Sequence, residues 1–326
     1  MNPSVVSLFS GCGGLDLAFA LEGFDVIWAN EINNAAADTH EHNFPHSTIS
    51  RDSIIDIHSS DIPCSDIIVG GFPCQDFSTL SKRQGINAPR GCLYMEFLRI
   101  VEAKKPTAFV AENVKGILSA NKGEAIRRIM EDFSALGYTL SCKLYNFADY
   151  GVPQMRERVI IVGILGSQEF IHPAPTHRGK HTTSLEALQG VESISANNEP
   201  IKIRDRTREL LKKIPEGCNF TSIPKGDPLY VKGMISHVYR RLHRDKPSMT
   251  VIAAGGGGTR GYHYEEPRPL TNRELARLQT FPDNFIFKGS IVEVRRQIGN
   301  AVPPEGARHI ARAIRGLLTK KKHCGG

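Results

Sequence analysis

Short apolar runs alternate with amphipathic stretches along the first half of the chain. The apolar runs predict strands at residues 5–9, 24–29, 48–50, 66–69, 108–111, 139–146 and 159–164. The helical spacing of apolar positions between them predicts helices at 15–21, 95–103 and 124–136. Alternating strands and helices are typical of a parallel sheet covered by helices, which binds ligands at the carboxyl ends of its strands. The sequence therefore predicts an α/β, doubly wound fold.

This pattern ends after Gly166. Proline, glycine and basic residues interrupt the segment 171–270, which includes four consecutive glycines at 255–258. Helical spacing returns at 272–279 and at 304–318, where two prolines open a helix. We therefore expect a large domain over 1–170, a small irregular domain over 171–270, and a C-terminal segment over 271–326 that returns to the large domain and completes it.

The composition is that of a globular protein in a reducing compartment. Of the 326 residues, 40% are hydrophobic, which is enough for one large domain and a smaller one. Seven scattered cysteines without a CxxC pair argue against a disulfide framework and a zinc site, and we expect no bound metal. The first residues enter an apolar strand without the segments typical of an export signal or membrane span. We expect a cytoplasmic protein.

The net charge of +7 is concentrated in the irregular segment. Residues 171–270 contain 16 Lys and Arg against 10 Asp and Glu, an excess of six. Such an excess favours a polyanion as partner. A solvated basic surface without a partner explains the charge alone equally well.

A glycine-rich loop, SGCGG at 10–14, lies between the first predicted strand and helix. Its glycines let backbone amides approach a ligand at the helix N-terminus. Glu31 ends the second strand 20 residues after Gly11, where doubly wound folds place an acid that accepts from ribose hydroxyls. The spacing GxGG, rather than GxGxxG, disfavours a dinucleotide and indicates another adenosine-containing cofactor. Asp52, after the third strand, either accepts from the adenine amino group or is a turn residue.

A cysteine follows the fourth predicted strand, in GGFPCQDFS at 70–78. Cys74 would project into the ligand cleft, where neighbouring cations or amide dipoles can raise its thiolate fraction. Most cysteines of cytosolic proteins are inert packing residues, and Cys74 alone would be interpreted as one. Cys64 shares the Pro-Cys dipeptide without the glycines or the polar continuation, and we interpret it as structural.

A carboxyl group and two guanidinium groups are expected at the same edge of the sheet. Glu112 follows the fifth strand, while Arg156 and Arg158 precede the seventh, and strand alternation would direct both arginines the same way. With Cys74 they would form a site with a nucleophile, an acid and two cations. Taken singly, strand-end acids and paired arginines often form only salt bridges.

Six motifs follow one another along the chain: FSGCGGL at 9–15, GFPCQ at 71–75, ENV at 112–114, QMRER at 154–158, RELARLQTFP at 273–282 and QIGNAVPP at 297–304. In this order they resemble the cytosine carbon-5 DNA methyltransferases of the bacterial type. The resemblance spans almost the whole chain, except the middle of the basic segment. It implies a Rossmann-like methyltransferase domain, a target-recognition domain over 171–270, and methyl transfer from S-adenosylmethionine to carbon 5 of cytosine.

The resemblance implies four catalytic residues: Cys74, Glu112, Arg156 and Arg158. Cys74 would add to carbon 6 of cytosine, while Glu112 hydrogen-bonds to and protonates ring nitrogen 3, directing electron density to carbon 5. After methyl transfer, removal of the carbon-5 proton expels Cys74. Arg158 would hold the base carbonyl and Arg156 would steady the site. The base has to be flipped out of the duplex for this attack.

The resemblance also implies how S-adenosylmethionine is bound. It assigns Glu31 to the ribose and Asp52 to adenine, although Arg51 and Ser53 stand where the family commonly has glycine and isoleucine. The remaining pocket residues come from the glycine loop, facing the methionine and sugar, and from later motifs: Phe9, Gly11, Gly13, Leu15, Pro73, Leu93, Asn300 and Val302.

Double-stranded DNA is the implied substrate. The segment 75–91 resembles the family's mobile loop, which closes over the flipped base. The implied DNA-contacting residues of this loop and of the target-recognition domain are Gln75, Ser78, Lys82, Arg83, Arg90, Arg240, Arg241 and Thr250. We expect a monomer, acting as an orphan methylase or beside a cognate restriction endonuclease.

Three other functions are compatible with parts of the sequence. An RNA (tRNA) cytosine-5 methyltransferase shares the scaffold, but its CysPheThr signature does not occur in the chain. A catalytically inactive DNA-binding homologue would be expected to have lost at least one of the four catalytic residues. A NAD-dependent oxidoreductase would need the GxGxxG spacing.

Replacing Cys74 by serine tests the proposed nucleophile. A serine hydroxyl is a far weaker nucleophile than a thiolate at neutral pH, so we expect Cys74→Ser to abolish methyl transfer while cofactor binding survives. Turnover on DNA and calorimetric titration with S-adenosylmethionine measure the two effects, with Cys64→Ser as the matched control. Full activity of Cys74→Ser would exclude this cysteine as the nucleophile.

Overall fold

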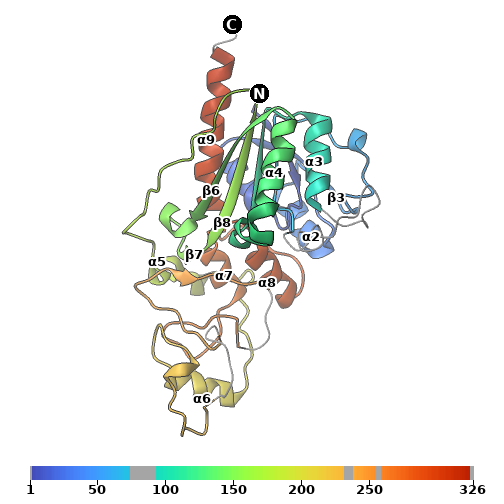
Figure 1. Ribbon diagram of the computed structural model, residues 1–326. Coiled ribbons are helices and arrows are strands. Elements are labelled where there is room, and N and C mark those ends of the chain that lie inside the picture. Colours follow the sequence, from blue (N-terminus) through green and yellow to red (C-terminus); the bar gives the residue numbers. More distant parts are fainter. Residues whose placement is uncertain (1, 74–92, 231–237, 254–257, 324–326) are drawn as a thin grey trace. The chain divides into compact units, whose positions relative to one another are not determined.

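The computed structural model describes residues 2–73, 93–230, 238–253 and 258–323, without the side chains of 320–323. Figure 1 shows its elements. The strands are β1 (Ser4–Leu8), β2 (Asp25–Asn30), β3 (Thr48–Ser50), β4 (Ile67–Gly70), β5 (Ala108–Val114), β6 (Tyr138–Asn146), β7 (Gln154–Met155), β8 (Glu157–Leu165) and β9 (Ser248–Met249). The α-helices are α1 (Gly14–Leu21), α2 (Asn34–Asn43), α3 (Leu93–Lys104), α4 (Glu124–Ala135), α5 (Ser184–Leu188), α6 (Asp205–Lys213), α7 (Asn272–Leu278), α8 (Ile291–Asn300) and α9 (Pro304–His323). Within these ranges, no helix combines the length and the apolar character needed to cross a membrane.

The main sheet has seven strands in the order β3-β2-β1-β4-β5-β8-β6. The pairs β1–β2, β1–β4, β2–β3 and β4–β5 are parallel. β8 runs antiparallel to both of its neighbours, β5 and β6. The direction of strand succession reverses between β1 and β4, which is where doubly wound sheets form a ligand-binding crevice. The predicted α/β, doubly wound fold is confirmed.

Two glycines allow β1, β4 and β5 to approach closely at this crevice. A Cβ atom at Gly70 would collide with the carbonyl oxygen of Leu8, at the end of β1. A Cβ atom at Gly71 would lie 3.0 Å from Oε2 of Glu112, in β5. Packing therefore requires the glycine at position 70, while a side chain at position 71 would displace the carboxylate of Glu112.

An apolar core joins the sheet to α3 and α4, which lie side by side against it (Figure 1). Phe97 of α3, Phe109 of β5 and Phe133 of α4 are fully buried. Their ring centroids are 6.0 Å apart for Phe97–Phe109 and Phe97–Phe133, and 4.4 Å apart for Phe109–Phe133. Each buried ring stabilises the fold by roughly 2 kcal/mol relative to exposure, so this trio fixes both helices on the sheet.

The strands and helices predicted from the sequence are all present, with ends displaced by a few residues. Three helices of nine or ten residues, α2, α6 and α8, were not predicted. The buried face of α2 is formed mainly by alanines with Thr39 and His40, and its start is set by Asn33, whose side chain accepts from Ala36 N. α8 begins at a capping box formed by Ser290 and Glu293. α2 lacks an apolar stripe, whereas α8 has one in Ile291, Val294 and Ile298 that the sequence analysis did not use.

The chain divides by its contacts into two compact units. The first comprises Met1–Asn146, Glu157–Ala174 and Gly306–Gly326, and the second Phe147–Arg156 and Pro175–Glu305. The second unit contains α5 to α8, the short β7–β9 pair and a small core that includes Leu210, Leu211 and Phe220. Residues 271–305 pack within this second unit, and α9 from Gly306 onwards packs within the first.

Glu22, at the end of α1, fixes α9 to the first unit. Its carboxylate accepts from Arg308 at 3.0 Å and from two nitrogens of Arg312 at 3.0 and 2.8 Å. Its carbonyl oxygen accepts from Arg315. Burial opposes ionisation of Glu22, but the hydrogen bonds and charges of Arg312 and Arg308 outweigh it and lower the pKa of this carboxyl. The charged form of Glu22 therefore stabilises the fold.

Neutralising Glu22 should weaken this attachment. We expect Glu22→Gln to lower the free energy of unfolding by about 1–2 kcal/mol at pH 7, because charge-assisted hydrogen bonds are lost while the exposed Arg312 is partly screened by solvent. Since the folded-state pKa is lowered, the contribution is complete above the ordinary glutamate value of about 4.3 and disappears as the pH falls through the lower folded value.

Urea denaturation at several pH values measures this difference. The matched control is Glu131→Gln on α4, whose partner Arg127 is exposed, and this change should leave the stability nearly unchanged. Equal stability of wild type and Glu22→Gln at pH 7 would contradict the role of this carboxylate.

Candidate active site

The glycine loop at 10–14 is fixed to the end of β2 by hydrogen bonds. Ser10 N donates to Asn30 O at 3.0 Å, and Gly11 N donates to Oε2 of Glu31 at 2.9 Å. The other carboxylate oxygen of Glu31 accepts from Asn33 N at 2.7 Å. Gly11 has φ +57° and open space where a side chain would begin. The loop therefore presents its backbone to an open space beside a carboxylate.

Glu31 lies in an environment that disfavours its charge. Burial raises the pKa of its carboxyl, and the amides of Asn33 and Gly11 oppose this only in part. Since each further donor favours the ionised form, a ligand with hydroxyl donors would stabilise the carboxylate. The two hydroxyls of a ribose are such donors.

Two buried polar residues pack behind the loop. His40 Nε2 lies 3.3 Å from Oδ1 of Asp16, and neither side chain is exposed. A Cβ atom at Gly13, which has φ +90°, would collide with the ring of Phe44, and that ring stacks on His40. Cys12 of the same loop is buried, and burial raises the pKa of its thiol. Cys12 is therefore unsuited to act as a nucleophile at neutral pH.

A cavity of about 450 Å³ opens at the ends of β2 and β3. It is lined by Trp28, Ser50, Asp52, Ser53, Asp56, Ile57 and Asp61. Arg51 forms ion pairs with α2, to Asp38 at 2.6 Å and to Glu41 at 3.0 Å. These pairs hold the guanidinium of Arg51 on α2. Arg51 therefore does not neutralise the acidic lining of the cavity, although it precedes Asp52 in the sequence.

Asn30 is a positioning residue that the sequence analysis did not identify. It is buried at the end of β2, and its side-chain amide donates to the carbonyl oxygens of Asp52 at 2.9 Å and Ser50 at 3.3 Å. It therefore holds the turn that carries Asp52. The signal in the sequence is a polar residue that closes an apolar run immediately before Glu31.

Cys74 lies outside the described residues, but the segment that leads to it is within them. Phe72 is buried, and its carbonyl oxygen accepts from Nδ2 of Asn113 at 3.0 Å. Asn113 is itself buried in β5, and its Oδ1 accepts from Val114 N at 2.9 Å. Asn113 thus attaches the segment before Cys74 to β5, another positioning role that the sequence analysis missed.

Glu112 and Arg158 form an ion pair between neighbouring strands. Nε of Arg158 lies 2.8 Å from Oε1 of Glu112, and the two side chains are only 15% and 11% exposed. The antiparallel register of β5 and β8 pairs Val114 with Arg158, so the ion pair is diagonal across the ladder. With the backbone of Gly71 close to Oε2 of Glu112, a carboxylate and a guanidinium meet at the crevice edge of the sheet. Such a pair can hydrogen-bond to a heterocyclic base that presents both donors and acceptors.

Arg156 belongs to the second unit and is completely buried. Its guanidinium donates to Val251 O at 3.1 Å and to Gly299 O at 2.9 Å. Gln154 is also buried; its amide nitrogen donates to Oε1 of Gln279 at 3.0 Å, and its own Oε1 accepts from Val251 N at 2.8 Å. The QMRER motif therefore holds together segments that are about 100 and 140 residues further along the chain.

The remaining cofactor residues predicted in the first unit differ in exposure. Phe9 has φ 54° and packs partly buried against the core. Leu15 is buried in α1, and the partly buried Leu93 begins α3. Pro73 is exposed after β4.

Four predicted residues of the second unit differ in exposure. Asn300 is exposed at the end of α8, whereas Val302 is buried. Thr250 is partly buried, and its hydroxyl donates to Met155 O at 2.6 Å. Arg240 is partly exposed.

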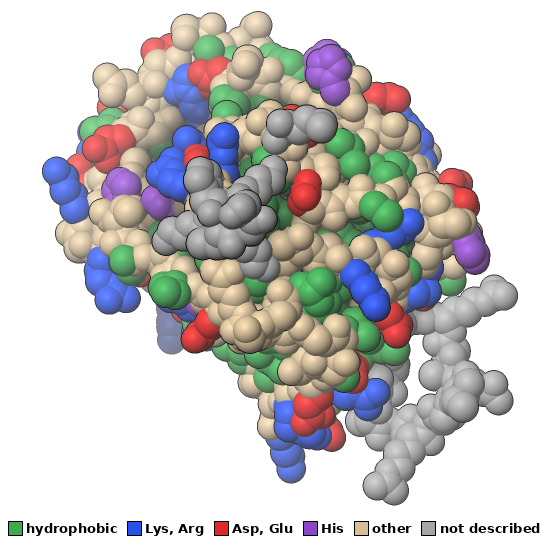
Figure 2. All heavy atoms as spheres, turned by 90° about the horizontal axis from the view of Figure 1, so that it is seen from above, with side chains coloured by type: hydrophobic (Ala, Val, Ile, Leu, Met, Phe, Trp, Pro, Cys, Tyr) green, Lys and Arg blue, Asp and Glu red, His purple; other side chains and the backbone are tan. Residues whose placement is uncertain are grey.

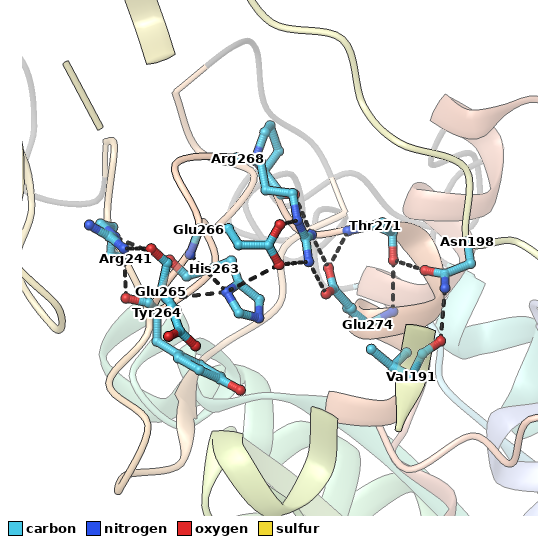
Figure 3. Close-up of polar contacts among 11 residues, drawn as sticks. Val191, Asn198, Arg241, His263, Tyr264, Glu265, Glu266, Arg268, Thr271 and Glu274 are labelled. Atoms are coloured by element: carbon cyan, nitrogen blue, oxygen red, sulfur yellow. Dashed lines mark hydrogen bonds and ion pairs between the residues drawn. The ribbon is translucent and has the colours of Figure 1, made fainter. Parts of the chain in front are cut away.

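Arg241 was predicted to contact DNA, but its guanidinium is used by the fold of the second unit. Arg241 is buried, and Figure 3 shows it beside the turn at 263–265. At distances between 2.6 and 3.3 Å it donates to the carbonyl oxygens of Leu211, Ile214, His263, Tyr264 and Glu265. Since its donors are taken by main-chain carbonyls, we replace the predicted DNA contact by a structural role.

The RELARLQTFP motif is also used for packing (Figure 3). Glu274 is buried and accepts from Arg268 at 2.8 and 2.9 Å and from Thr271 N at 2.7 Å. The hydroxyl of Thr271 donates to Asn198 at 2.6 Å, and Asn198 donates to Val191 O at 2.9 Å. One chain of polar contacts thus connects the segment 191–198 to the start of α7.

The other predicted DNA contacts, Gln75, Ser78, Lys82, Arg83 and Arg90, lie outside the described residues. On the face of the molecule drawn in Figure 2, basic and acidic side chains are interspersed.

Comparisons of the sequence with known proteins match one protein family. Residues 4–316 match the model of the family described as C-5 cytosine-specific DNA methylase. The Type II methyltransferase M.NgoFVII of Neisseria gonorrhoeae is 54% identical over 96% of this chain and 86% of its own length. The DNA (cytosine-5-)-methyltransferase M.ApeKI of Aeropyrum pernix is 32% identical over 97% of this chain and 98% of its own length.

Solved structures show the same similarity. A prophage-encoded DNA modification methyltransferase from E. coli superposes with a TM-score of 0.77 at 27% identity, covering 98% of this chain and all of its own. A Spodoptera frugiperda DNMT2 variant has a TM-score of 0.67 at 16% identity, covering 96% of this chain and 99% of its own. The second likeness concerns the fold alone.

Shortening the side chain of Arg156 should destabilise the second unit. Lysine keeps the positive charge, but its single ammonium group cannot replace the planar guanidinium that serves both Val251 O and Gly299 O. We expect Arg156→Lys to lower the free energy of unfolding by about 1–3 kcal/mol, the cost of a buried carbonyl left without its donor. Urea denaturation followed by circular dichroism measures the change.

The matched control is Arg178→Lys in the same unit. The Arg178 side chain is 77% exposed and 3.9 Å from Asp149, so this change should stay within about 0.5 kcal/mol. If Arg156→Lys proved as stable as wild type, the two carbonyl contacts would not hold the unit together.

Proposed function

The chain belongs to the C-5 cytosine-specific DNA methylase family and is a DNA (cytosine-5-)-methyltransferase, and on this premise we propose that it methylates carbon 5 of a flipped-out cytosine within a specific double-stranded DNA sequence. The observation that carries the proposal is the Glu112–Arg158 pair at the crevice edge of the sheet. Glu112 faces Gly71, three residues before Cys74 in the sequence. The acid and the cation lie beside the segment that precedes Cys74, at the edge where doubly wound sheets bind ligands, which supports the proposal.

We propose S-adenosylmethionine as the methyl donor, since the site at the end of β2 suits an adenosine. Glu31 would accept from the ribose hydroxyls, and its raised pKa would fall as they bind. Asp52, in the acidic cavity, would accept from the adenine amino group. The open space at Gly11 leaves room for the sugar and methionine beside the loop. When bound, this cofactor supplies an electrophilic methyl group.

The reaction needs cytosine made nucleophilic at carbon 5. The thiolate of Cys74 forms a bond to carbon 6, and Glu112 donates a proton or a strong hydrogen bond to ring nitrogen 3, so that the electron pair is directed to carbon 5. Arg158 holds the base carbonyl and compensates the negative charge that develops. After methylation, a base removes the proton from carbon 5, and its electron pair re-forms the double bond between carbons 5 and 6. The bond from carbon 6 to Cys74 then breaks, its electron pair leaves with the thiolate, and nitrogen 3 returns its proton to Glu112.

The remaining parts of the proposal concern the DNA. The target base leaves the stack, and the second unit supplies contacts to the duplex around it, including Arg240 and Thr250. The name of the N. gonorrhoeae relative contains "Type II", and by analogy we propose that this chain acts in a restriction-modification system with an endonuclease of the same site. We also propose that it acts as a monomer.

Methylation of DNA in vitro tests the function. The protein is incubated with S-adenosylmethionine and unmethylated genomic DNA, and nucleosides are analysed by mass spectrometry alongside bisulfite sequencing. We expect 5-methylcytosine in one short sequence context. Product on tRNA, with none on DNA from protein that binds the cofactor, would exclude the proposed substrate.

Replacing Glu112 by glutamine tests its role at ring nitrogen 3. Loss of the proton donor should slow single-turnover methyl transfer by about 100-fold or more, with little change in DNA affinity. The matched control is Glu157→Gln, an exposed carboxylate paired with Lys115, which should leave the rate unchanged. An unchanged rate in Glu112→Gln would mean that another group activates the base.

A further inference from the structure

The connection between β3 and β4 carries Asp52 and is mostly irregular. Residues 51–66 contain a single regular element, the 3₁₀ turn η1 (Ser59–Asp61). Just after Asp52 the chain forms a turn over 53–57, in which Asp56 N donates to Ser53 O at 2.8 Å. The backbone of such a segment finds few partners within the segment itself, so side chains from neighbouring elements have to satisfy its carbonyl groups.

Arg99 of α3 provides these contacts. Its Nη2 donates to the carbonyl oxygens of Ile54 and Ile57, each at 3.1 Å. Its Nη1 donates to the hydroxyl of Ser59 at 2.6 Å. Its Nε donates to Oε2 of Glu96 at 2.8 Å, which keeps the guanidinium against its own helix. Because the donors of arginine lie on one rigid plane, this side chain holds three points of the segment in a fixed arrangement.

The contacts of Arg99 fix the orientation of the turn 53–57, whereas apolar contacts fix its location. Ile54 and Ile62 are buried in the core of the first unit, and Ile57 packs partly buried against it. Apolar burial is not directional, so it does not determine how the main chain between these residues is rotated. Hydrogen bonds to two of its carbonyl groups do. We therefore expect the segment to stay folded without Arg99, but with a less defined turn.

The turn 53–57 belongs to the region where the cofactor is proposed to bind. The cavity at the ends of β2 and β3 is lined by four residues of this stretch, Asp52, Ser53, Asp56 and Ile57. From β2, Asn30 donates to Asp52 O at 2.9 Å. From α3, Arg99 holds the residues that follow. The main chain around Asp52 is thus held on both sides in the sequence, by side chains of two different elements.

We propose that Arg99 is a positioning residue for recognition of adenine: by holding the turn 53–57, it keeps the carboxylate of Asp52 where it accepts from the adenine amino group. The inference rests on the proposed function, because it concerns the binding of S-adenosylmethionine. Arg99 lies outside the six motifs and acts through Asp52. A binding group that is held in place before the ligand arrives raises affinity, because less order has to be imposed on binding.

A pair of ligands that differ at the adenine amino group tests the inference. S-adenosylhomocysteine has this amino group, and S-inosylhomocysteine has a carbonyl oxygen in its place. Wild type should prefer the adenosyl ligand, because a carboxylate accepts from an amino group but faces a second acceptor in the inosyl ligand. Arg99→Gln should bind the adenosyl ligand roughly 10-fold more weakly and the inosyl ligand almost as wild type does, as calorimetric titration measures.

Steady-state kinetics separate positioning from a loss of folded protein. In Arg99→Gln the KM for S-adenosylmethionine should rise by about the same factor, while kcat at saturating cofactor stays within about twofold. Arg99→Lys should lie between wild type and Arg99→Gln, because one ammonium group cannot serve all three acceptors. The matched control is Arg127→Gln on α4, which removes an exposed arginine paired only with residues of its own helix in the described structure. It should bind both ligands as wild type does.

Three results would overturn the inference. Arg99→Gln could keep the wild-type preference for the adenosyl ligand, it could lose affinity equally for both ligands, or its kcat could fall with an unchanged KM. Wild type is titrated with both ligands in parallel. Failure of wild type to bind S-adenosylhomocysteine would contradict the proposed cofactor itself, whereas a preference that is the same in wild type and Arg99→Gln would contradict the role of Arg99 alone.

Discussion

A buried carbonyl group needs a donor, and where the chain forms neither helix nor sheet that donor has to be a side chain. The second unit depends on this constraint, since most of its backbone is irregular. Arg156 serves Val251 and Gly299, and Arg241 serves five carbonyls around a small core. Arginine suits this task because five donors on one rigid plane can reach several segments at once. The polar side chains of this unit thus supply many of the hydrogen bonds to buried carbonyl groups that helices and sheets supply in the first unit.

Because of the same constraint, some charged residues in the sequence motifs stabilise the fold and do not contact substrate. The QMRER motif contains both kinds of arginine, since Arg156 is enclosed among carbonyls while Arg158 pairs with Glu112 at the edge of the sheet. RELARLQTFP is used for packing by Glu274, which closes a capping box and binds Arg268. A charged residue in a motif is therefore not by itself a sign of contact with substrate. Burial and hydrogen-bond partners separate the two cases.

The first unit was predictable because its signals are local. Runs such as Ile67–Gly70 identify central strands, and the spacing of Gly11 and Glu31 identified a loop and a carboxylate that do meet, at 2.9 Å. The roles of Asn30 and Asn113 could not be predicted, because each depends on which distant carbonyl comes within reach after folding. Arg241 was misassigned for the same reason. Net charge indicates the excess of cations in a segment, but not which cations form hydrogen bonds within the fold.

The attachment of α9 to Glu22 has a consequence for how the chain is made. The hydrogen bonds between Glu22 and α9 join residues 286 to 293 positions apart in sequence. Nearly all of the second unit is therefore synthesised before the first unit can be completed. During synthesis, the surface of the first unit that binds α9 stays uncovered until α9 leaves the ribosome. The second unit is in effect a long insertion between two parts of one domain. Its surface can change during evolution without altering the contact that closes the domain.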